Sequence, residues 1–231
     1  MLPLRDKNPS GIIPWAVYGL IGLNTVVFLF EVSLPRDRLM ELAEQFGIVP
    51  RQITLALQGK ANLLGALVIP TFASMFLHGG WAHLLGNMWF LHIFGDNVEA
   101  RLGRARFILF YLFCGLAASA AQYVLDPNSP VPIIGASGAI AGVLGAYVVC
   151  WPRARVLTLV PFFYFIHFVH LPAYFVLGFW FLIQFFQGAA SLGVQFTHGV
   201  AYWAHVGGFA AGAVLMYLLP GTRGPRRYER R

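Results

Sequence analysis

Residues 135–147 read "GASGAIAGVLGAY", a run of small and apolar side chains that contains a single serine, Ser137. Small residues repeated along an apolar helix allow a second helix to approach closely inside a membrane. The stretch therefore predicts a tightly packed helix in a membrane-spanning bundle. It leaves open whether Ser137 is only a packing residue or a reactive hydroxyl.

The composition of the whole chain indicates a membrane protein. Of its 231 residues, 58% are hydrophobic and only 11% are charged, and the mean hydropathy is +0.67. Soluble domains carry about 25% charged residues. The two cysteines, Cys114 and Cys150, both lie in apolar runs and indicate no disulfide framework. We therefore expect an all-α, polytopic membrane protein.

Segments that are apolar enough to cross a bilayer occur at six places. A spanning helix needs roughly 20 mostly apolar residues. The expected bundle covers residues 12–219, between an N-terminal tail (1–11) and a basic C-terminal tail (220–231). A long extracytoplasmic segment, about 34–80, follows the first span, and its amphipathic part, 35–52, is expected at the membrane interface. The six expected spans are 12–32, 82–95, 107–125, 135–151, 171–186 and 201–219.

The basic residues predict the orientation of this bundle. Six spans place both termini on one side, together with the second-to-third and fourth-to-fifth connections. That side carries twelve of the sixteen lysines and arginines. Cytoplasmic loops are enriched in these residues, so we expect both termini in the cytoplasm and the protein in the cell membrane. The net charge of +7 is thereby explained by topology and does not indicate nucleic-acid binding.

Four polar side chains are expected at a similar depth in three different spans. Counting from the cytoplasmic ends, Ser137 and His205 lie about fifteen residues along their helices, or ~22 Å, and His83 lies about twelve, or ~18 Å. Asn87 is four residues after His83 and shares its helix face. Because the hydrocarbon core is ~30 Å thick, the four groups are predicted to meet below the outer membrane surface. Polar residues at such depth are costly and usually functional.

This set of side chains supports acyl transfer. Serine needs a base to take its proton, and histidine is the usual base. None of the nine carboxylates falls near the reactive level of the fourth or sixth span, so a Ser137–His205 dyad is expected in place of a triad. Asn87, His83 and the unpaired backbone N–H of Ser137 can stabilise an oxyanion. Close approach of the two helices is expected from their glycines: Gly138, Gly142, Gly145, Gly207, Gly208 and Gly212.

Each of these residues also has a structural interpretation when it is taken alone. Ser137 can pack between helices, and His205, His83 and Asn87 can form interhelical hydrogen bonds. Only the similar depth of the four side chains in the membrane favours an active site. His78 is expected at the lip of this site. Asn24 and Gln184 are interpreted as helix-to-helix hydrogen bonders and Ser119 as a packing serine. Trp180 is interpreted as lipid-facing, with the lining of a substrate entrance as the alternative. The remaining histidines are interpreted as structural or interfacial: His92, His167, His170 and His198.

Four segments of the chain resemble the signatures of the rhomboid family of intramembrane serine proteases. They are "FLHGGWAHLLGNM", "FGDNVEARLG", "GASGAIAG" and "AHVGGFAAG", in the family's order and on the expected spans. The resemblance covers residues from about 70 to 219. It implies Ser137 as nucleophile, His205 as general base, and an oxyanion hole formed by His83, Asn87 and the Ser137 N–H.

The resemblance also has implications beyond the dyad. It implies that the loop after the fifth span caps the site, and that the substrates are single-pass membrane proteins cut in or near their transmembrane segment. No metal or cofactor is expected, and the oligomeric state is not indicated. The supporting positions are His78, Gly135, Gly138 and Gly208. One position departs from the family: Ala141 stands where many members carry an aromatic residue that stacks on the catalytic histidine.

Other functions are compatible with parts of this pattern. A proteolytically inactive relative would bind membrane clients, although such relatives usually lack the serine or the histidine. A transporter or metal-ion carrier could use His78, His83 and His205, but intramembrane carboxylates and inverted repeats are not found. A metalloprotease would need a motif such as HExxH, which the sequence does not contain.

Overall fold

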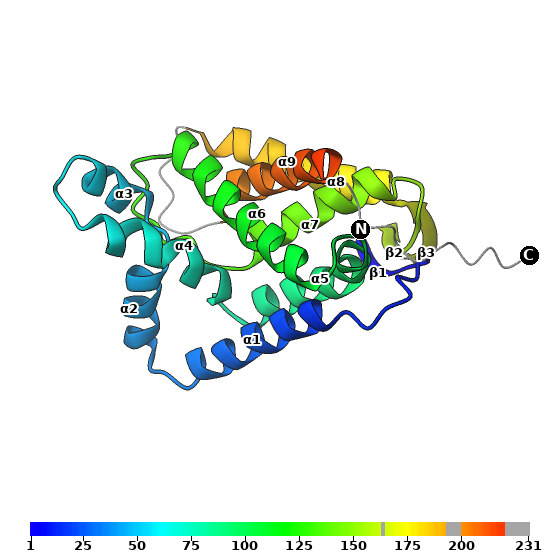
Figure 1. Cartoon of the computed structure of the whole chain (residues 1–231), viewed down its shortest axis with the longest axis horizontal. Coiled ribbons are helices and arrows are strands. Elements are labelled where there is room, and N and C mark those ends of the chain that lie inside the picture. The colour runs from blue at the N-terminus through cyan, green and yellow to red at the C-terminus, as the bar shows by residue number, and fades with distance from the viewer. Residues whose placement is uncertain (163–164, 193–199, 220–231) are drawn as a thin grey trace, which may run out of the picture.

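A computed structural model describes residues 1–162, 165–192 and 200–219, and it is mostly helical (Figure 1). Each expected span overlaps one helix. These helices are α1 (Trp15–Glu31), α5 (Trp81–Leu102), α6 (Arg104–Leu125), α7 (Ser137–Cys150), α8 (Ala173–Ser191) and α9 (Tyr202–Leu218).

Helix α7 lies in the middle of the bundle. All its residues from Gly138 to Tyr147 are buried, and it packs against α5, α6, α8 and α9. The contact with α9 is made backbone to backbone, because a Cβ atom at Gly208 would collide with the carbonyl oxygen of Gly138, and one at Gly212 with that of Gly142. The predicted close approach of these two helices is thus confirmed.

The helices differ in how well they meet the requirements for crossing a membrane. Among the described residues, α6 and α8 are long and apolar enough, and a third candidate is the bent pair Leu64–Phe76 and Trp81–Leu102, whose halves meet at 82°. Helices α1 and α7 are apolar but shorter. Length and composition thus give two or three candidate spans, and the expected count of six stays a prediction.

The segment expected as an extracytoplasmic loop is largely helical. It contains α2 (Arg36–Phe46), α3 (Pro50–Leu57), the π-helical turn η1 (Leu64–Val68), α4 (Ile69–Ala73) and the 3-10 turn η2 (Ser74–Phe76). Helix α2 has no buried residue, as expected for its amphipathic sequence. Backbone hydrogen bonds between Ile48 and Ile133 attach the segment to the chain that precedes α7.

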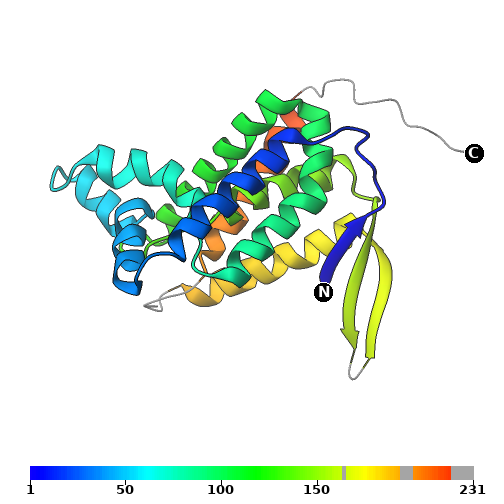
Figure 2. The same ribbon diagram turned by 90° about the horizontal axis from the view of Figure 1, so that it is seen from below.

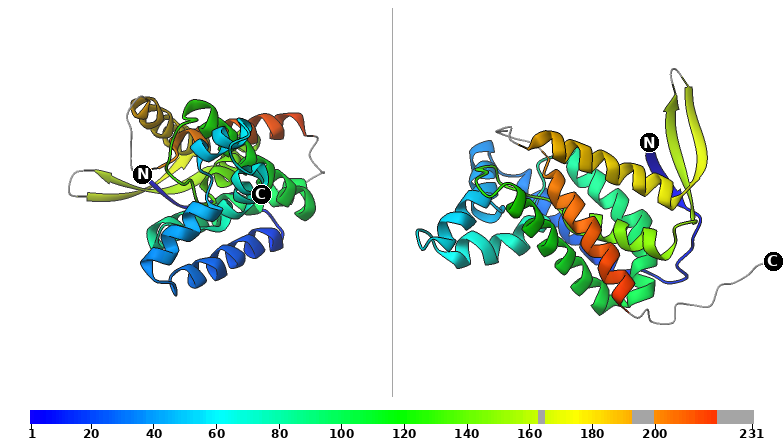
Figure 3. Two further views of the ribbon diagram at one scale, coloured as in Figure 1. Left: turned by 90° about the vertical axis from the view of Figure 1, so that its left-hand side faces the viewer. Right: turned by 90° about the horizontal axis from the view of Figure 1, so that it is seen from above.

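The all-α prediction is wrong for three segments, which form an antiparallel sheet. Strands β1 (Leu2–Asp6), β2 (Arg155–Phe162) and β3 (Phe165–Pro172) are ordered β1-β2-β3. In the register, Asp6 pairs with Val156, and Val156 in turn with Leu171. The β2–β3 hairpin is rich in β-branched and aromatic residues, which favour strands. Consequently α8 begins at Ala173, two residues later than the expected fifth span. Figures 2 and 3 show the sheet at one end of the bundle.

Two acidic side chains attach the N-terminal segment to this end of the bundle. Asp6 accepts hydrogen bonds from Tyr147 Oη (2.6 Å) and Asn97 Nδ2 (3.1 Å). Burial raises the pKa of the Asp6 carboxyl to about 6, and the hydrogen bond from Tyr147 opposes that rise. Glu99 is fully buried and accepts from the backbone N–H groups of Ala16 and Val17, the first turn of α1. Residues of the expected N-terminal tail thus form part of the folded structure.

Candidate active site

A glycine turn places Ser137 at the start of α7. Gly135 has a φ of +117°, which favours glycine, and its N–H donates to the carbonyl oxygen of Ser74 (2.8 Å). Ala136 is the N-cap of the helix, and Ser137 is its first residue. The backbone N–H of Ser137 is therefore among those that have no acceptor within the helix.

The imidazole of His205 lies between Ser137 and a residue of α8. Its Nε2 is 2.8 Å from Ser137 Oγ, and its Nδ1 is 2.8 Å from Gln184 Oε1. The side chains of His205 and Gln184 are both buried. The structure thus brings together the two residues of the expected dyad. The interpretation of Gln184 as an interhelical hydrogen bonder is confirmed, but its partner, His205, was not foreseen.

An aromatic ring packs on His205 from α8. The ring centroids of Trp180 and His205 are 5.7 Å apart, and the ring planes are inclined by 36°. Trp180 also lines the cavity of the site, so its place fits the alternative interpretation, a lining residue, and not a purely lipid-facing one. Ala141 is fully buried, and the tryptophan supplies the ring that this position lacks. Trp180 and Gln184 are four residues apart and share one helix face, a spacing that could have been recognised in the sequence.

Two side chains of α5 lie next to the turn that precedes Ser137. A Cβ atom at Gly135 would be 2.6 Å from His83 Nε2 and 3.7 Å from Asn87 Nδ2. The N–H of Gly79 donates to His83 Nδ1 (3.4 Å), so that a neutral His83 carries its proton on Nε2. Asn87 Nδ2 is buried and has no hydrogen-bond partner among the described residues. Buried donors are rarely left unpaired, and this one is available to a ligand.

His78 lies behind His83 and not at the lip of the site. Its side chain is buried, and its ring stands edge-on to that of His83 at a centroid distance of 5.1 Å. The carboxylate of Glu31, at the end of α1, accepts the His78 backbone N–H with both oxygens (3.2 and 3.1 Å). The role of Glu31 is not apparent from the sequence, because 47 residues separate it from His78.

Most of the side chains around the dyad line one cavity of about 1120 Å³, which is also bordered by α6 and to which His78, Glu31 and Gln184 do not contribute. Its lining includes His83, Asn87, Ser137, Trp180 and His205. No cluster of three or more metal-ligating side chains occurs within residues 1–162, 165–192 and 200–219. His198 and most of the loop expected to cap the site, residues 193–199, lie outside the described residues.

Comparison with known proteins identifies the family of the chain. The Rhomboid domain model matches residues 65–221, which include every residue of the candidate site except Glu31. The chain belongs to the rhomboid family. The rhomboid protease GluP of Bacillus subtilis is 49% identical over 70 residues, which are 30% of this chain and 13% of GluP. Rhomboid-like protein 11, a chloroplastic protein of Arabidopsis thaliana, is 30% identical over 155 residues, 62% of this chain and 50% of that protein. This rhomboid chain thus spans half or less of the length of these two relatives.

Proposed function

We propose that this rhomboid protein is a serine endopeptidase that hydrolyses peptide bonds in or near the transmembrane segments of single-pass membrane proteins. The observation that carries the proposal is the 2.8 Å contact between Ser137 Oγ and His205 Nε2 inside a cavity. The unpaired Asn87 amide beside it supports an oxyanion site. The name of one relative, rhomboid protease GluP, agrees with this activity.

The first half of the reaction forms an acyl-enzyme. His205 Nε2 takes the hydroxyl proton while Ser137 Oγ attacks the carbonyl carbon of the substrate. The resulting oxyanion accepts hydrogen bonds from Asn87 Nδ2, His83 Nε2 and the Ser137 N–H, each donor contributing about 3–4 kcal/mol in the transition state. The tetrahedral intermediate collapses as the imidazolium donates its proton to the leaving amine.

The second half of the reaction releases the acyl group. His205 takes a proton from water, and the hydroxide attacks the ester carbonyl carbon in the same oxyanion site. Collapse of this second intermediate returns the proton to Ser137 Oγ and frees the new carboxyl end. No metal or cofactor takes part in the proposed reaction.

The proposed placement in the membrane follows from the helices and the charges. We assign six spans, one to each of α1, α5, α6, α7, α8 and α9. The protein would lie in the plasma membrane with both termini in the cytoplasm. Seven of the eleven described lysines and arginines lie in or beside β1 and β2 or at the junction of α5 and α6, and the other four lie in α2, α3 and the turn after α3. The positive-inside rule assigns the end with the larger group, which carries the sheet, to the cytoplasm. The site then opens toward the extracytoplasmic side.

Cleavage of a model single-pass substrate by the purified protein in detergent tests the proposal. Ser137→Ala and His205→Ala are expected to abolish cleavage. The matched controls Ser33→Ala and His92→Ala, at exposed positions, are expected to retain it. Equal cleavage by either dyad variant would disprove the mechanism. Binding of the substrate without cleavage by the wild-type protein would indicate the alternative, a proteolytically inactive membrane-client binding protein.

A further inference from the structure

Gln184 contacts the side of the His205 ring that faces away from the serine. Its Oε1 is 2.8 Å from Nδ1, in the position that the carboxylate of a catalytic triad occupies in serine proteases. The contact is shielded from solvent, because 8% of the Gln184 surface and 9% of the His205 surface are exposed. A hydrogen bond of this length in a buried place fixes the ring far better than a solvated one.

We propose that Gln184 is a positioning residue that holds His205 in the tautomer a general base requires. An amide oxygen can only accept, so the contact places the ring proton on Nδ1. Nε2 is then left without a proton and accepts the hydroxyl hydrogen of Ser137. The opposite tautomer would carry a proton on Nε2 and could not take another from the serine. This inference rests on the proposed dyad.

The neutral amide suits a site at this depth. A carboxylate would also fix the tautomer, but a charged side chain within a membrane is costly. The described part of α8 contains no charged residue. Trp180, one turn earlier, packs on the same ring. Helix α8 thus supplies both a hydrogen-bond acceptor and an aromatic surface to His205.

Nitrogen-15 NMR of histidine-labelled protein in micelles tests the tautomer directly and does not depend on substrate. The His205 signals are identified by their loss in His205→Asn. We expect a protonated Nδ1 in the wild type and in the matched control Gln58→Met, whose position is exposed. In Gln184→Met, which keeps the side-chain volume, we expect a mixture or the Nε2–H form. The same tautomer in Gln184→Met and the wild type would overturn the inference even if Ser137 proves to be the nucleophile.

The rate at which a fluorophosphonate modifies Ser137 gives a second readout. General-base catalysis contributes about 10²–10⁴-fold to a rate. We expect Ser137 to be modified about 10- to 100-fold more slowly in Gln184→Met than in the wild type. Gln184→Glu restores an acceptor oxygen and is expected to recover most of it. Wild-type rates in Gln184→Met would contradict the proposal, as would equal losses in the Met and Glu variants. Unfolding midpoints in SDS separate these losses from failure to fold.

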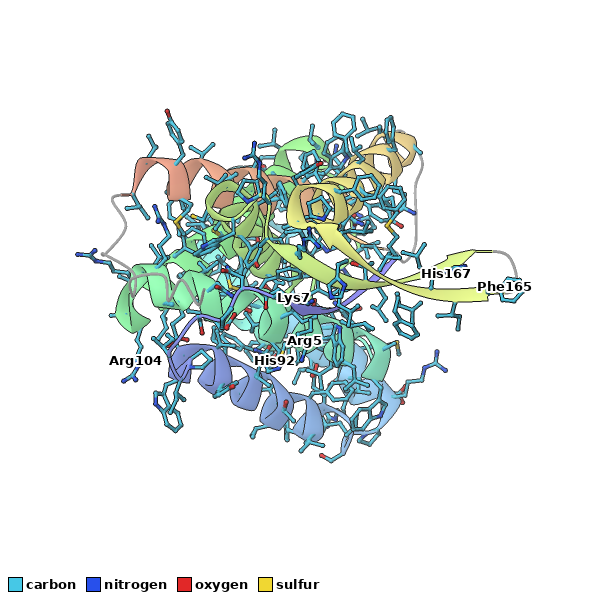
Figure 4. The ribbon with its side chains drawn as sticks, turned by 90° about the vertical axis from the view of Figure 1, so that its right-hand side faces the viewer. Arg5, Lys7, His92, Arg104, Phe165 and His167 are labelled. Carbon is cyan, nitrogen blue, oxygen red and sulfur yellow. The ribbon has the colours of Figure 1, made fainter. Side chains whose placement is uncertain are left out.

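A different surface, on the β2–β3 hairpin, carries an independent inference. The hairpin extends past α8 at the end of the bundle (Figures 2 and 3), and Phe165 and His167 lie far from the helices (Figure 4). Phe165, Ile166 and Phe168 are 70%, 62% and 62% exposed. Neighbouring strand residues point to opposite faces, so both faces of the hairpin present large apolar side chains. Exposed apolar patches of this kind indicate an interaction site.

The chemistry around the hairpin points to the bilayer as its partner. At its base lie the exposed basic residues Arg5, Lys7 and Arg155, two of which Figure 4 labels beside the strands. The apolar surface continues onto α8, where Phe175 and Phe179 are exposed. Strand β3 forms the edge of the sheet, and open sheet edges do not occur within the hydrocarbon core. We infer that the hairpin lies in the headgroup region of an anionic leaflet.

Photocrosslinking of the full chain in vesicles tests this second inference. Phe168→benzoylphenylalanine is expected to form phospholipid adducts, at higher yield in phosphatidylcholine vesicles containing phosphatidylglycerol than in phosphatidylcholine alone. The same probe at Lys60, an exposed position in the turn after α3, serves as the control and is expected to form few adducts. Absence of lipid adducts at position 168, equal yields in both vesicles, or crosslinked pairs of this chain would overturn the inference.

Discussion

Substitution of Gly135 by alanine should disable the oxyanion site without touching the dyad. A Cβ atom at this position would lie 2.6 Å from both Cε1 and Nε2 of His83. Ordinary contacts of a Cβ atom begin at about 3.4 Å. The imidazole must therefore retreat by roughly 0.8 Å, the difference between these two distances, from the side on which the oxyanion is proposed to form.

A displacement of this size is large for a hydrogen-bond donor. Donors act when they lie about 2.7–3.1 Å from the oxyanion, and loss of one lowers the rate by about 10²–10³-fold, or ~2.7–4 kcal/mol. We therefore expect Gly135→Ala to slow peptide cleavage about 100-fold. The φ of +117° adds backbone strain, about 1–3 kcal/mol of folding free energy.

The assay compares cleavage rates and SDS unfolding midpoints of four proteins: the wild type, Gly135→Ala, His83→Ala and the double variant. Once the imidazole is gone, the added methyl group has nothing to displace, so the double variant should cleave about as slowly as His83→Ala. Gly59→Ala is the control for strain, because Gly59 has a φ of +72° and no atom within 4 Å of an added Cβ. The reasoning would be refuted if the double variant cleaved much more slowly than His83→Ala, or if Gly135→Ala cleaved at the wild-type rate.

Three further perturbations test the packing and the anchors of the bundle. Gly208→Ala should lower the free energy of unfolding by about 1–3 kcal/mol, because the added methyl group meets a backbone carbonyl of α7. The control Gly22→Ala, where an added Cβ has no atom within 4 Å, should leave it unchanged. Equal SDS unfolding midpoints for the two variants would contradict this. Glu99→Ala should lower the free energy of unfolding by about 1–3 kcal/mol, since two buried N–H groups of α1 lose their acceptor. Glu99→Gln keeps an acceptor oxygen and should lower it less. SDS unfolding midpoints measure both changes. Between about pH 4 and about pH 6 the folded Asp6 binds a proton that the unfolded chain has lost. The Asp6 contribution to stability should therefore fall as the pH rises through this window, by about 1 kcal/mol after allowance for partial exposure. The dependence of the SDS unfolding midpoint on pH should be less steep in Asp6→Asn than in the wild type, and equal slopes would contradict this.

The expected helices and the convergence of the dyad were accessible from the sequence for a simple reason. Apolar runs and small-residue spacing report on helices directly, and the rise of 1.5 Å per residue converts sequence position into depth. That count predicted that Ser137 and His205 share a level, and the structure places their reactive atoms 2.8 Å apart.

The partners of these residues were not accessible in the same way. Depth along a span does not indicate the direction in which a side chain points, so Gln184 and Trp180 could not be assigned to His205. Glu31 and Glu99 are carboxylates near helix ends, and their acceptor roles depend on backbone groups that are distant in the chain. A count of charged residues cannot reveal such contacts.

The sheet was missed because its sequence is ambiguous. The segment 155–172 is apolar and β-branched, and short apolar runs of this kind are compatible with either a strand or a buried helix. The pairing of β1 with β2 joins residues 150 to 157 positions apart. Local periodicity gives no information on such long-range pairing.

Mass spectrometry after reaction with a fluorophosphonate probe tests the central proposal, that His205 activates Ser137, most directly. The folded protein in detergent should carry one adduct, on the peptide that contains Ser137, and the adduct should be absent from His205→Ala and from protein unfolded in SDS. An adduct on another serine, or equal labelling of Ser137 in His205→Ala, would contradict the proposal.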